Sequence, residues 1–414
     1  MVDQDRLALI GKRYRDSVAE WSDPHDWAHV WRAELNRGGF EAYELLKTEV
    51  VDAGKCVGCA ACVTICPTDV FDYIDERPID TRAGACVQCV LCADVCPVMR
   101  PADVSMEADL KYLPDIKDDG FGPYAYEVLA RSTIPAIVTQ TQDGGIVSTL
   151  LIDALDRGLI KGAIVGDIDA EDPQVGRQFL ATTEEEVLAC SGSRYTYSPN
   201  TLAFQQAMEE NVYPLAVVGV PCQVDGVRLQ QHSGLRMEMN RWYRNNVNLV
   251  IGLFCSESFT HDSISAIGER FGVTRQEITR INIKGRVVVD MTEGRQEKMS
   301  LKKFRSYARP ACHYCKDYAA DQSDIAVGGL GLDDWSYVVV RTEAGHEAFQ
   351  RVIDEGGIET RPVADAPKSR PLLIRLSEQK RDGPLPAQLA PHLDIDGLPV
   401  DRSADGATNG GTPS

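Results

Sequence analysis

The sequence predicts two folded parts, a small domain at residues 49–112 built around metal clusters and a larger α/β domain at residues 113–381 with a mixed sheet. Eight of the 13 cysteines fall between residues 56 and 96, in two identical spacings. Beyond residue 120, apolar β-branched runs alternate with amphipathic segments, which is typical of strands alternating with helices. The 414 residues are enough for two or three domains.

The two ends of the chain differ from this central part. Residues 1–48 are expected to form a helical extension, because Ser22, Asp23 and Pro24 supply an N-cap and a first-turn proline. Residues 382–414 are rich in Pro, Gly, Asp and Ser, and we expect them to be disordered.

Charge and hydropathy exclude two classes of protein. A net charge of -19, from 43 basic and 62 acidic residues, lacks the basic field that nucleic-acid binding needs. No run approaches the ~18–20 apolar residues of a membrane-spanning helix, and the first 40 residues do not resemble a signal peptide. We therefore expect a cytoplasmic protein whose cysteines serve metal or redox chemistry rather than disulfides.

The small domain carries the motif C-x2-C-x2-C-x3-C-P twice, and its short spacers suggest that clusters rather than a hydrophobic core hold the fold. Three thiolates on one tight loop can bind three corners of a cubane, and the fourth reaches the other cluster. Two zinc sites are the alternative, but zinc does not require this doubled run. The stretch resembles a bacterial-type ferredoxin. The predicted ligands are Cys56, Cys59, Cys62 and Cys96 for one [4Fe-4S] cluster, and Cys86, Cys89, Cys92 and Cys66 for the other.

The larger domain is predicted from its hydrophobic periodicity. Its expected strands are residues 136–141, 162–168, 215–220, 247–254 and 324–327, and its expected helices include residues 146–157, 199–210 and 343–354.

Four further cysteines lie near the ends of these elements. Cys222 and Cys255 follow two predicted strands, at the sheet edge where ligands usually bind, and Cys312 and Cys315 form a C-x-x-C pair. If the strands are neighbours and the C-x-x-C loop folds over them, four thiolates converge and a third cluster is possible. The residues alone equally allow Cys222 and Cys255 to be buried small hydrophobes. Cys190 has no partner set and is interpreted as structural.

Several segments indicate a bound cofactor. Gly144 and Gly145 precede a predicted helix, where backbone amides favour a diphosphate. The polar loop at residues 191–200 suits a cofactor lining, and Gly328 begins a glycine-rich stretch that reaches Trp335 beside a planar ligand. Lys302 belongs to a basic run that could hold an anionic tail. Each signal has a plainer alternative: turn geometry for the glycines and a solvated face for the lysines.

Together these segments resemble the family of beta subunits of coenzyme F420-reducing hydrogenases and dehydrogenases. The residues that carry the resemblance are 142–148, 193–200, 220–223, Phe254-Cys255, and Cys312 to Tyr318 running on to Asp324 and Gly328. The match spans about residues 120–362. It implies that Cys222, Cys255, Cys312 and Cys315 hold a third [4Fe-4S] cluster and that the chain binds FAD. The candidate cofactor-binding residues are Gly144, Gly145, Ile146, Val147, Ser148, Ser193, Arg194, Tyr195, Tyr197, Ser198, Asn200, Lys302, Asp324, Gly328 and Trp335.

The resemblance implies an iron-sulfur flavoprotein that exchanges hydride with coenzyme F420, its substrate, and passes single electrons onward. The expected partner is a ferredoxin or a hydrogenase, dehydrogenase or reductase component, and an added two-cluster domain is known in the F420H2 dehydrogenase input subunit. Two alternatives remain: a reductase of another planar substrate, such as a chlorophyll derivative, and a non-catalytic electron-relay subunit. No acid, base or nucleophile is predicted, because the protein positions the cofactors and tunes their potentials.

Overall fold

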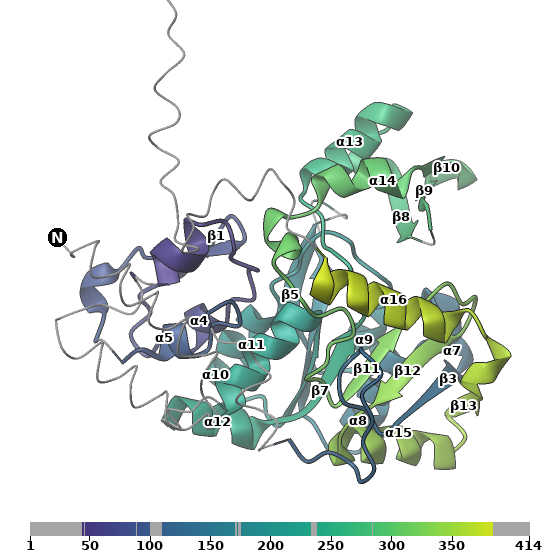
Figure 1. Cartoon of the computed structure of the whole chain (residues 1–414), viewed down its shortest axis with the longest axis horizontal. Coiled ribbons are helices and arrows are strands. Elements are labelled where there is room, and N and C mark those ends of the chain that lie inside the picture. The colour runs from purple at the N-terminus through teal and green to yellow at the C-terminus, as the bar shows by residue number, and fades with distance from the viewer. Residues whose placement is uncertain are drawn as a thin grey trace, which may run out of the picture.

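The computed structural model describes residues 44, 46–87, 89–99, 110–169, 172, 175–232, 238–283 and 285–383. The predictions for residues 1–48 and 382–414 fall almost entirely outside this range. In the described part, a cysteine-rich region lies beside helices of a larger α/β body, and a small β module stands above that body (Figure 1). None of the described helices is both long enough and apolar enough to cross a bilayer.

The cysteine-rich region consists of two similar halves. In each half a residue with left-handed backbone, Ala60 (φ 59°) or Val90 (φ 60°), precedes a one-turn helix. The repeated spacing of the sequence therefore produces a repeated backbone geometry. The elements of this region are η1 (Lys47–Val51), α4 (Ala61–Thr64), β1 (Asp72–Ile74), β2 (Arg77–Ile79), η2 (Ala83–Ala85) and α5 (Leu91–Asp94).

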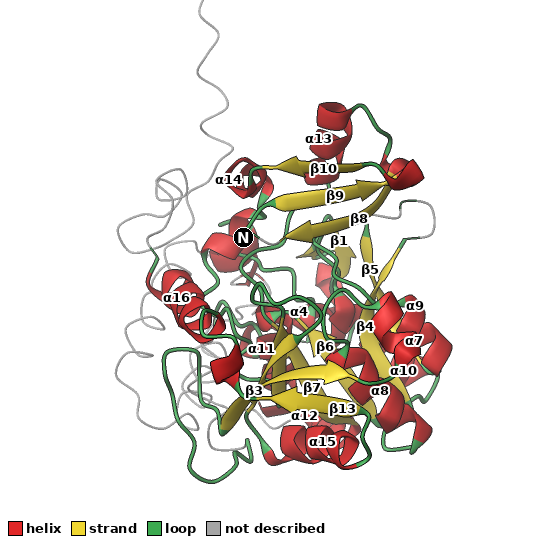
Figure 2. Ribbon diagram, turned by 90° about the vertical axis from the view of Figure 1, so that its right-hand side faces the viewer, coloured by secondary structure: helices red, strands yellow, loops and turns green. Residues whose placement is uncertain are grey.

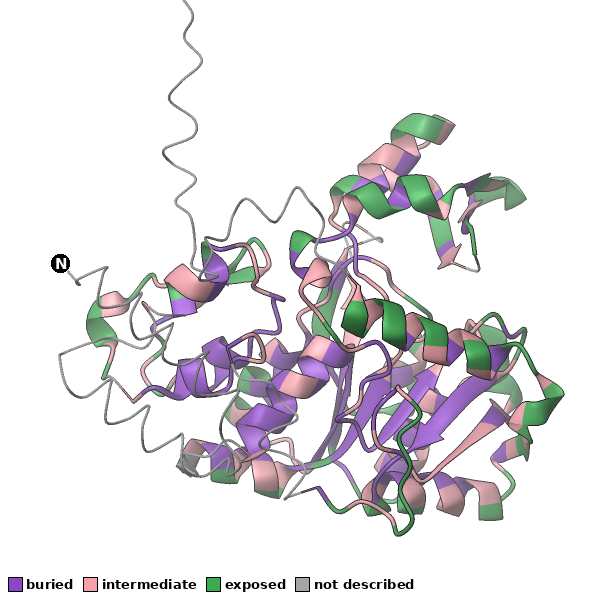
Figure 3. Cartoon of the chain, viewed as in Figure 1, coloured by how far each residue is buried: buried purple, intermediate pink, exposed green. Residues whose placement is uncertain are grey.

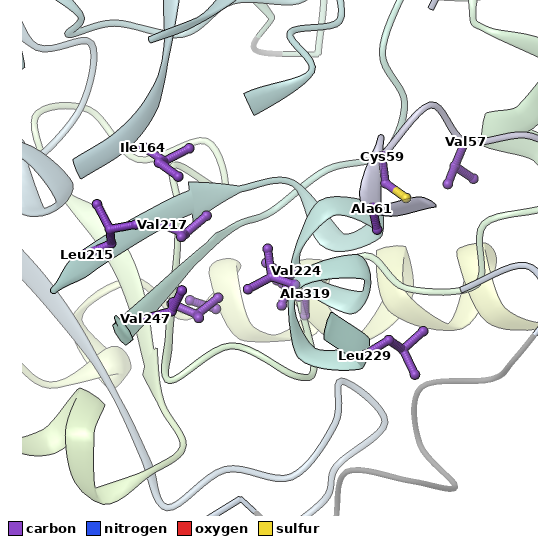
Figure 4. Packing of buried hydrophobic residues seen from close by; sticks show 14 of the residues in the cluster. Val57, Cys59, Ala61, Ile164, Leu215, Val217, Val224, Leu229, Val247 and Ala319 are labelled. Carbon is purple, nitrogen blue, oxygen red and sulfur yellow. The ribbon is translucent and has the colours of Figure 1, made fainter. Parts of the chain in front are cut away.

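The small domain has more apolar packing than the sequence suggests. Val50, Val63, Phe71 and Val90 are buried together in a core of this region. A second set of its apolar residues belongs to the core of the α/β body, in one buried cluster with Phe204, Val224 and Tyr243. Figure 4 shows part of this cluster. The expectation that clusters alone hold this region is therefore wrong, and the two parts share one continuous interior. The shared residues are Val57, Cys59, Ala61, Ile65, Leu91 and Val95.

An eight-stranded mixed sheet forms the centre of the α/β body, as predicted. Its order is β13-β3-β12-β11-β7-β6-β4-β5. The inner pairs β4/β6, β6/β7 and β7/β11 are parallel, and all the outer pairs are antiparallel. The strands are β3 (Tyr126–Ser132), β4 (Gly162–Ile168), β5 (Gly176–Ala181), β6 (Leu215–Gly219), β7 (Val247–Leu253), β11 (Ile325–Gly328), β12 (Ser336–Val340) and β13 (Ile358–Arg361).

Helices cover both faces of this sheet and bury its strands (Figure 3). One face packs against α7 (Pro135–Gln140), α8 (Ile146–Asp156), α9 (Glu184–Ala189) and α15 (Glu343–Asp354). The other face packs against α10 (Ala203–Glu209), α11 (Pro221–His232), α12 (Glu238–Asn246) and α16 (Ser369–Asp382). Short 3-10 turns also occur along the chain, at η3 (Asn200–Leu202), η4 (Arg275–Glu277), η5 (Thr292–Gly294), η6 (Arg305–Tyr307), η7 (Pro310–His313) and η8 (Val363–Asp365).

The small β module is an insertion between β7 and β11. It contains the antiparallel strands β8 (Ile278–Ile283), β9 (Val287–Met291) and β10 (Gln296–Met299), with α13 (Asp262–Phe271) and α14 (Leu301–Phe304). Its buried apolar residues form a separate core around Phe259, Val289 and Phe304. Figure 2 shows the module above the main sheet. In sequence it separates Cys255 from Cys312.

Most predicted elements of the α/β body are confirmed within one residue, but one strand is wrong. Residues 136–141 form the end of α7, not a strand. Pro135 occupies the first helical turn, where its fixed φ and missing N–H are tolerated, and only Ile137 of this helix is buried. The apolar run therefore covers the sheet with one side chain, and the preceding segment forms the strand β3. The predicted helix at 199–210 is divided into η3 and α10.

A buried ion pair ties α11 to the end of β11. Arg228 Nη2 lies 2.8 Å from Asp324 Oδ1, with the two side chains 5% and 6% exposed. Asp324 also accepts hydrogen bonds from Val250 N and Thr342 Oγ1, both at 2.7 Å. We predict that Arg228→Met lowers the free energy of unfolding by about 3–5 kcal/mol, because it leaves a buried carboxylate without its cation. Guanidinium denaturation measures the change.

The matched control for this variant is Arg177→Met. Arg177 pairs with Asp167 at 2.7 Å, but its side chain is 45% exposed. Removing an exposed pair costs about 0–1 kcal/mol. Equal losses of unfolding free energy in the two variants would show that the buried Arg228–Asp324 pair contributes no more to stability than the exposed pair does.

Candidate redox site

The structure brings the eight N-terminal cysteines together as two crossed sets. The Cys62 thiol interacts electrostatically most strongly with the thiols of Cys59, Cys56 and Cys96, and less with that of Cys92. The Cys92 thiol interacts with those of Cys89, Cys66 and Cys86. The fourth cysteine of each motif thus joins the other loop. Burial raises the pKa of the Cys62 and Cys92 thiols well above their ordinary range. Without a metal these thiols are neutral, so binding as thiolates releases protons.

The other four cysteines also converge. Cys222 lies in the first turn of α11, directly after β6, and Cys255 lies two residues after β7, the parallel neighbour of β6. The Cys312 and Cys315 loop folds over both, and the thiol neighbours of Cys222 include Cys315, Cys255 and Cys312. Cys255 N donates to Tyr318 O at 2.9 Å, and Ser258 N donates to Cys312 Sγ at 3.4 Å. These four thiols form what we call the four-cysteine site.

Burial dominates the electrostatics of the four-cysteine site. It raises the pKa of Cys222 well above the ordinary range, and that of Cys255 and Cys315 to about 12. A cubane binds each of four thiolates through a different iron, and four is the number of thiols that meet here.

A lysine far away in the sequence completes this site. Lys380, on α16, donates to Cys312 O at 3.1 Å and to Ser256 O. Desolvation alone would lower the pKa of Lys380, but the neighbouring thiol groups, Cys315 first, outweigh it and raise the pKa. The sequence did not single out Lys380, because neither spacing nor motif connects it with the cysteines. It supplies a partly buried cation beside four potential thiolates.

A cavity of about 430 Å³ opens next to the four-cysteine site. Cys255 and Phe254 line it from the end of β7, and the first turn of α8, the 191–200 loop and the 328–331 loop enclose it. Of the predicted cofactor-binding residues, those that line it are Gly145, Ile146, Val147, Ser148, Ser193, Arg194, Tyr195, Tyr197, Ser198, Asn200 and Gly328.

The remaining predicted cofactor-binding residues have other surroundings and are not among the lining residues. Gly144 is buried beside Ser336, whose Oγ accepts its N–H at 3.1 Å. Asp324 is engaged in the ion pair with Arg228. Trp335 lies under the guanidinium groups of Arg131 and Arg361, 5.0 and 4.1 Å from the ring centre. Lys302 is exposed on α14, whereas Arg305 of the same basic run lines the cavity.

The glycine before α8 serves the protein's own packing. Gly145 has a left-handed φ of 72°, and a Cβ there would lie 2.7 Å from Ile137 Cγ2. Its left-handed backbone and the closeness of Ile137 therefore already explain a glycine at position 145, without an approaching phosphate. Ile146, Val147 and Ser148 nevertheless line the cavity in the first turn of α8, whose first amides have no side-chain cap because the N-cap is Gly145.

Several polar groups of the cavity wall bind other protein groups. Gln142 Nε2 donates to Asn282 Oδ1 at 2.8 Å, and Tyr195 OH accepts from Ile283 N at 3.1 Å, so both link the wall to β8. Arg194 Nη1 donates to the Cys190 and Gly192 carbonyls at 2.7 and 2.6 Å and shapes its own loop. Arg194 Nε is buried with no hydrogen-bond partner among the described residues. Cys190 stays outside the three cysteine sets.

Sequence comparison matches three family descriptions. Residues 128–205 match the N-terminal part, and residues 213–366 the C-terminal part, of the coenzyme F420 hydrogenase/dehydrogenase beta subunit. Residues 49–72 match the 4Fe-4S binding domain.

Three relatives show how much of the chain is shared. The coenzyme F420 hydrogenase subunit beta of Methanothermobacter thermautotrophicus is 34% identical, over 63% of this chain and 92% of the relative. A subunit of the F(420)H(2) dehydrogenase of Methanosarcina mazei is 34% identical, over 59% and 67%. The coenzyme F420-dependent sulfite reductase of Methanocaldococcus jannaschii is 30% identical over 78% of this chain but 50% of the relative.

A solved structure has the same fold. A chain in the F420-reducing [NiFe] hydrogenase complex from Methanosarcina barkeri superposes with a TM-score of 0.63 at 31% identity, covering 70% of this chain and 99% of that chain. The fold and the 4Fe-4S binding domain define an iron-sulfur oxidoreductase subunit. The chain belongs to the family of coenzyme F420 hydrogenase/dehydrogenase beta subunits, as the sequence motifs indicated.

Proposed function

We propose that this chain exchanges hydride with coenzyme F420 through FAD and passes single electrons through three [4Fe-4S] clusters to a redox partner. The observation that carries the proposal is that neighbouring thiols form a continuous series from the cavity to the ferredoxin-type loops. Cys255 lines the cavity, and the Cys222 thiol of the same four-cysteine site interacts electrostatically with the Cys59 thiol. The Cys62 thiol interacts in the same way with Cys59 of its own set and with Cys92 of the second set. These contacts support a route from the cavity outward.

Two features of the cavity support the binding of FAD. Its volume of about 430 Å³ lies within the usual range of cofactor sites, ~300–1,000 Å³. The N-terminal turn of α8 offers amides and a positive dipole end for a diphosphate, with Ile146, Val147 and Ser148 nearest. When bound, FAD supplies the conversion between a hydride and single electrons that cluster chemistry needs. A relay subunit without a substrate would need no such cavity.

The redox partner belongs to a complex or to a larger chain. The named relatives are a hydrogenase subunit, a dehydrogenase subunit and a sulfite reductase of which this chain covers 50%. The second ferredoxin-type set is the outer one on this route. Val87, in its loop, is 60% exposed, whereas Cys59 of the first set is 7% exposed against α11. We infer that the partner docks near residues 86–92.

An anaerobic titration with reduced F420 tests the hydride exchange. After rapid mixing, the flavin absorbance should bleach before the broad cluster absorbance falls, because the flavin cavity precedes the clusters on the proposed route. A protein that dithionite reduces fully, but reduced F420 leaves unchanged, would rule out F420 as its hydride donor.

Iron analysis tests the third cluster. Four irons per cubane predict about twelve irons per chain, and Cys222→Ser should lower the content to about eight while the ferredoxin-type clusters remain. Cys190→Ser is the control and should keep about twelve, because Cys190 stays apart from the three sets. A wild-type content of about eight would remove the third cluster from the proposal.

A substitution at Ser148 tests the FAD site. Ser148 lies in the first turn of α8 and lines the cavity. Ser148→Asp places a negative charge where a diphosphate would be repelled, so FAD affinity should fall about tenfold or more. Fluorescence titration of the deflavinated protein gives the affinity, with Ser148→Ala as the uncharged control. Equal affinity in both variants would move the diphosphate away from α8.

A further inference from the structure

Arg309 belongs to the four-cysteine site through its backbone and to the first ferredoxin-type loop through its side chain. Its N–H donates to Ser258 O, and its carbonyl accepts from Cys312 N, both at 2.9 Å. Its guanidinium leaves this loop, and Nη1 donates to Val57 O at 2.9 Å, next to Cys56. Only 7% of the side chain is exposed. One residue therefore connects the two cluster-binding loops directly.

The ferredoxin-type region is shaped to receive this guanidinium. Glu76 Oε2 lies 2.6 Å from Arg309 Nε. Gly58 has φ +74°, and a Cβ there would lie 2.5 Å from Arg309 Nη2. Asp75 and Glu76 form the two-residue turn between β1 and β2, both with positive φ (50° and 59°), although neither is glycine. Such backbone persists only where the surroundings impose it.

The same guanidinium also faces the four-cysteine site. Its carbon lies 3.9 Å from the ring centre of Tyr197, and the Tyr197 hydroxyl lies 3.9 Å from Cys222 Sγ. Glu76, Arg309 and Tyr197 thus form a continuous series of contacts between the loop of Cys56 and Cys59 and the thiol of Cys222. We call these three residues the bridge.

The bridge is distinct from the contacts that dock the ferredoxin-type region as a whole. Those contacts are made around α4: Gln230 Nε2 donates to Thr64 Oγ1 at 2.7 Å, and Tyr243 OH donates to Thr64 O at 2.9 Å. Neither of these hydrogen bonds involves Arg309 or Glu76. Loss of the guanidinium would therefore release residues 56–58 locally and leave the region docked.

We propose that Arg309, paired with Glu76, is a positioning residue that holds the first ferredoxin-type cluster at its electron-transfer distance from the cluster of the four-cysteine site. This inference rests on the proposed cluster content. In the transfer, one electron leaves the cluster bound by Cys222, Cys255, Cys312 and Cys315 and enters the cluster bound by Cys56, Cys59, Cys62 and Cys96, with no bond made or broken.

The test compares Arg309→Met, Arg309→Lys and Glu76→Gln with the control Arg177→Met. Each protein is purified with its clusters, analysed for iron and reduced with dithionite, and its electron paramagnetic resonance spectrum is recorded. This measurement needs neither F420 nor FAD. We expect unchanged iron in every protein, and a magnetic interaction between neighbouring reduced clusters that weakens in Arg309→Met and Glu76→Gln, is partly kept in Arg309→Lys and is unchanged in Arg177→Met.

A kinetic measurement complements the spectra. With reduced F420 as donor, flavin bleaching should keep its rate in Arg309→Met, while reduction of a one-electron acceptor should slow about tenfold or more, because small displacements of reacting groups cost large factors in rate. Full iron with unchanged magnetic interaction in both Arg309→Met and Glu76→Gln would overturn the inference. If Arg309→Met loses iron, the magnetic interaction in the isosteric variant Glu76→Gln decides whether the inference holds. A wild-type protein with fewer clusters would instead refute the proposed function.

Discussion

The close packing of one cluster loop against one helix is the constraint on which the rest of the structure depends. At Gly226 of α11, an added Cβ would lie 3.2 Å from both Ala61 Cβ and Cys59 Sγ. The same helix begins at Pro221-Cys222, one turn earlier, where the parallel strand β6 has just ended. A single helix therefore carries a cysteine of one set and packs against a cysteine of another. The shared apolar interior around α11 fixes this arrangement.

The sequence predicted the parts of this arrangement that local patterns encode. The buried strands β4, β6 and β7 are continuous apolar runs, and their ends located Cys222 and Cys255 at one sheet edge. The run at residues 136–141 has a similar composition, yet it buries only Ile137 and is helical. Composition does not reveal whether one or both faces of a segment will be covered by other elements. This is why the strand predicted at residues 136–141 was wrong.

The parts that the sequence could not predict are contacts between distant segments. Arg309 meets Val57 across 252 positions, and Lys380 meets Cys312 across 68. A basic residue in a charged run looks the same whether it is solvated or buried. Likewise, the polar 191–200 loop was placed at a cofactor cavity, but Tyr195 and Arg194 use much of their hydrogen-bonding capacity on protein groups. Residue type indicated that this loop lies at the cavity, and only the fold shows which of its polar atoms already bind other protein groups.

The position of Lys380 on the last described helix has a consequence for biosynthesis. The ligands of the two ferredoxin-type sets lie within residues 56–96 and leave the ribosome early. The four-cysteine site spans residues 222–315 and gains its lysine only when α16 folds against it. Iron and sulfide delivered during translation would thus meet the outermost ligands first and the innermost last. The cysteines are therefore synthesised in the order opposite to the proposed flow of electrons, and a chain truncated before α16 would leave its central thiols without their neighbouring cation.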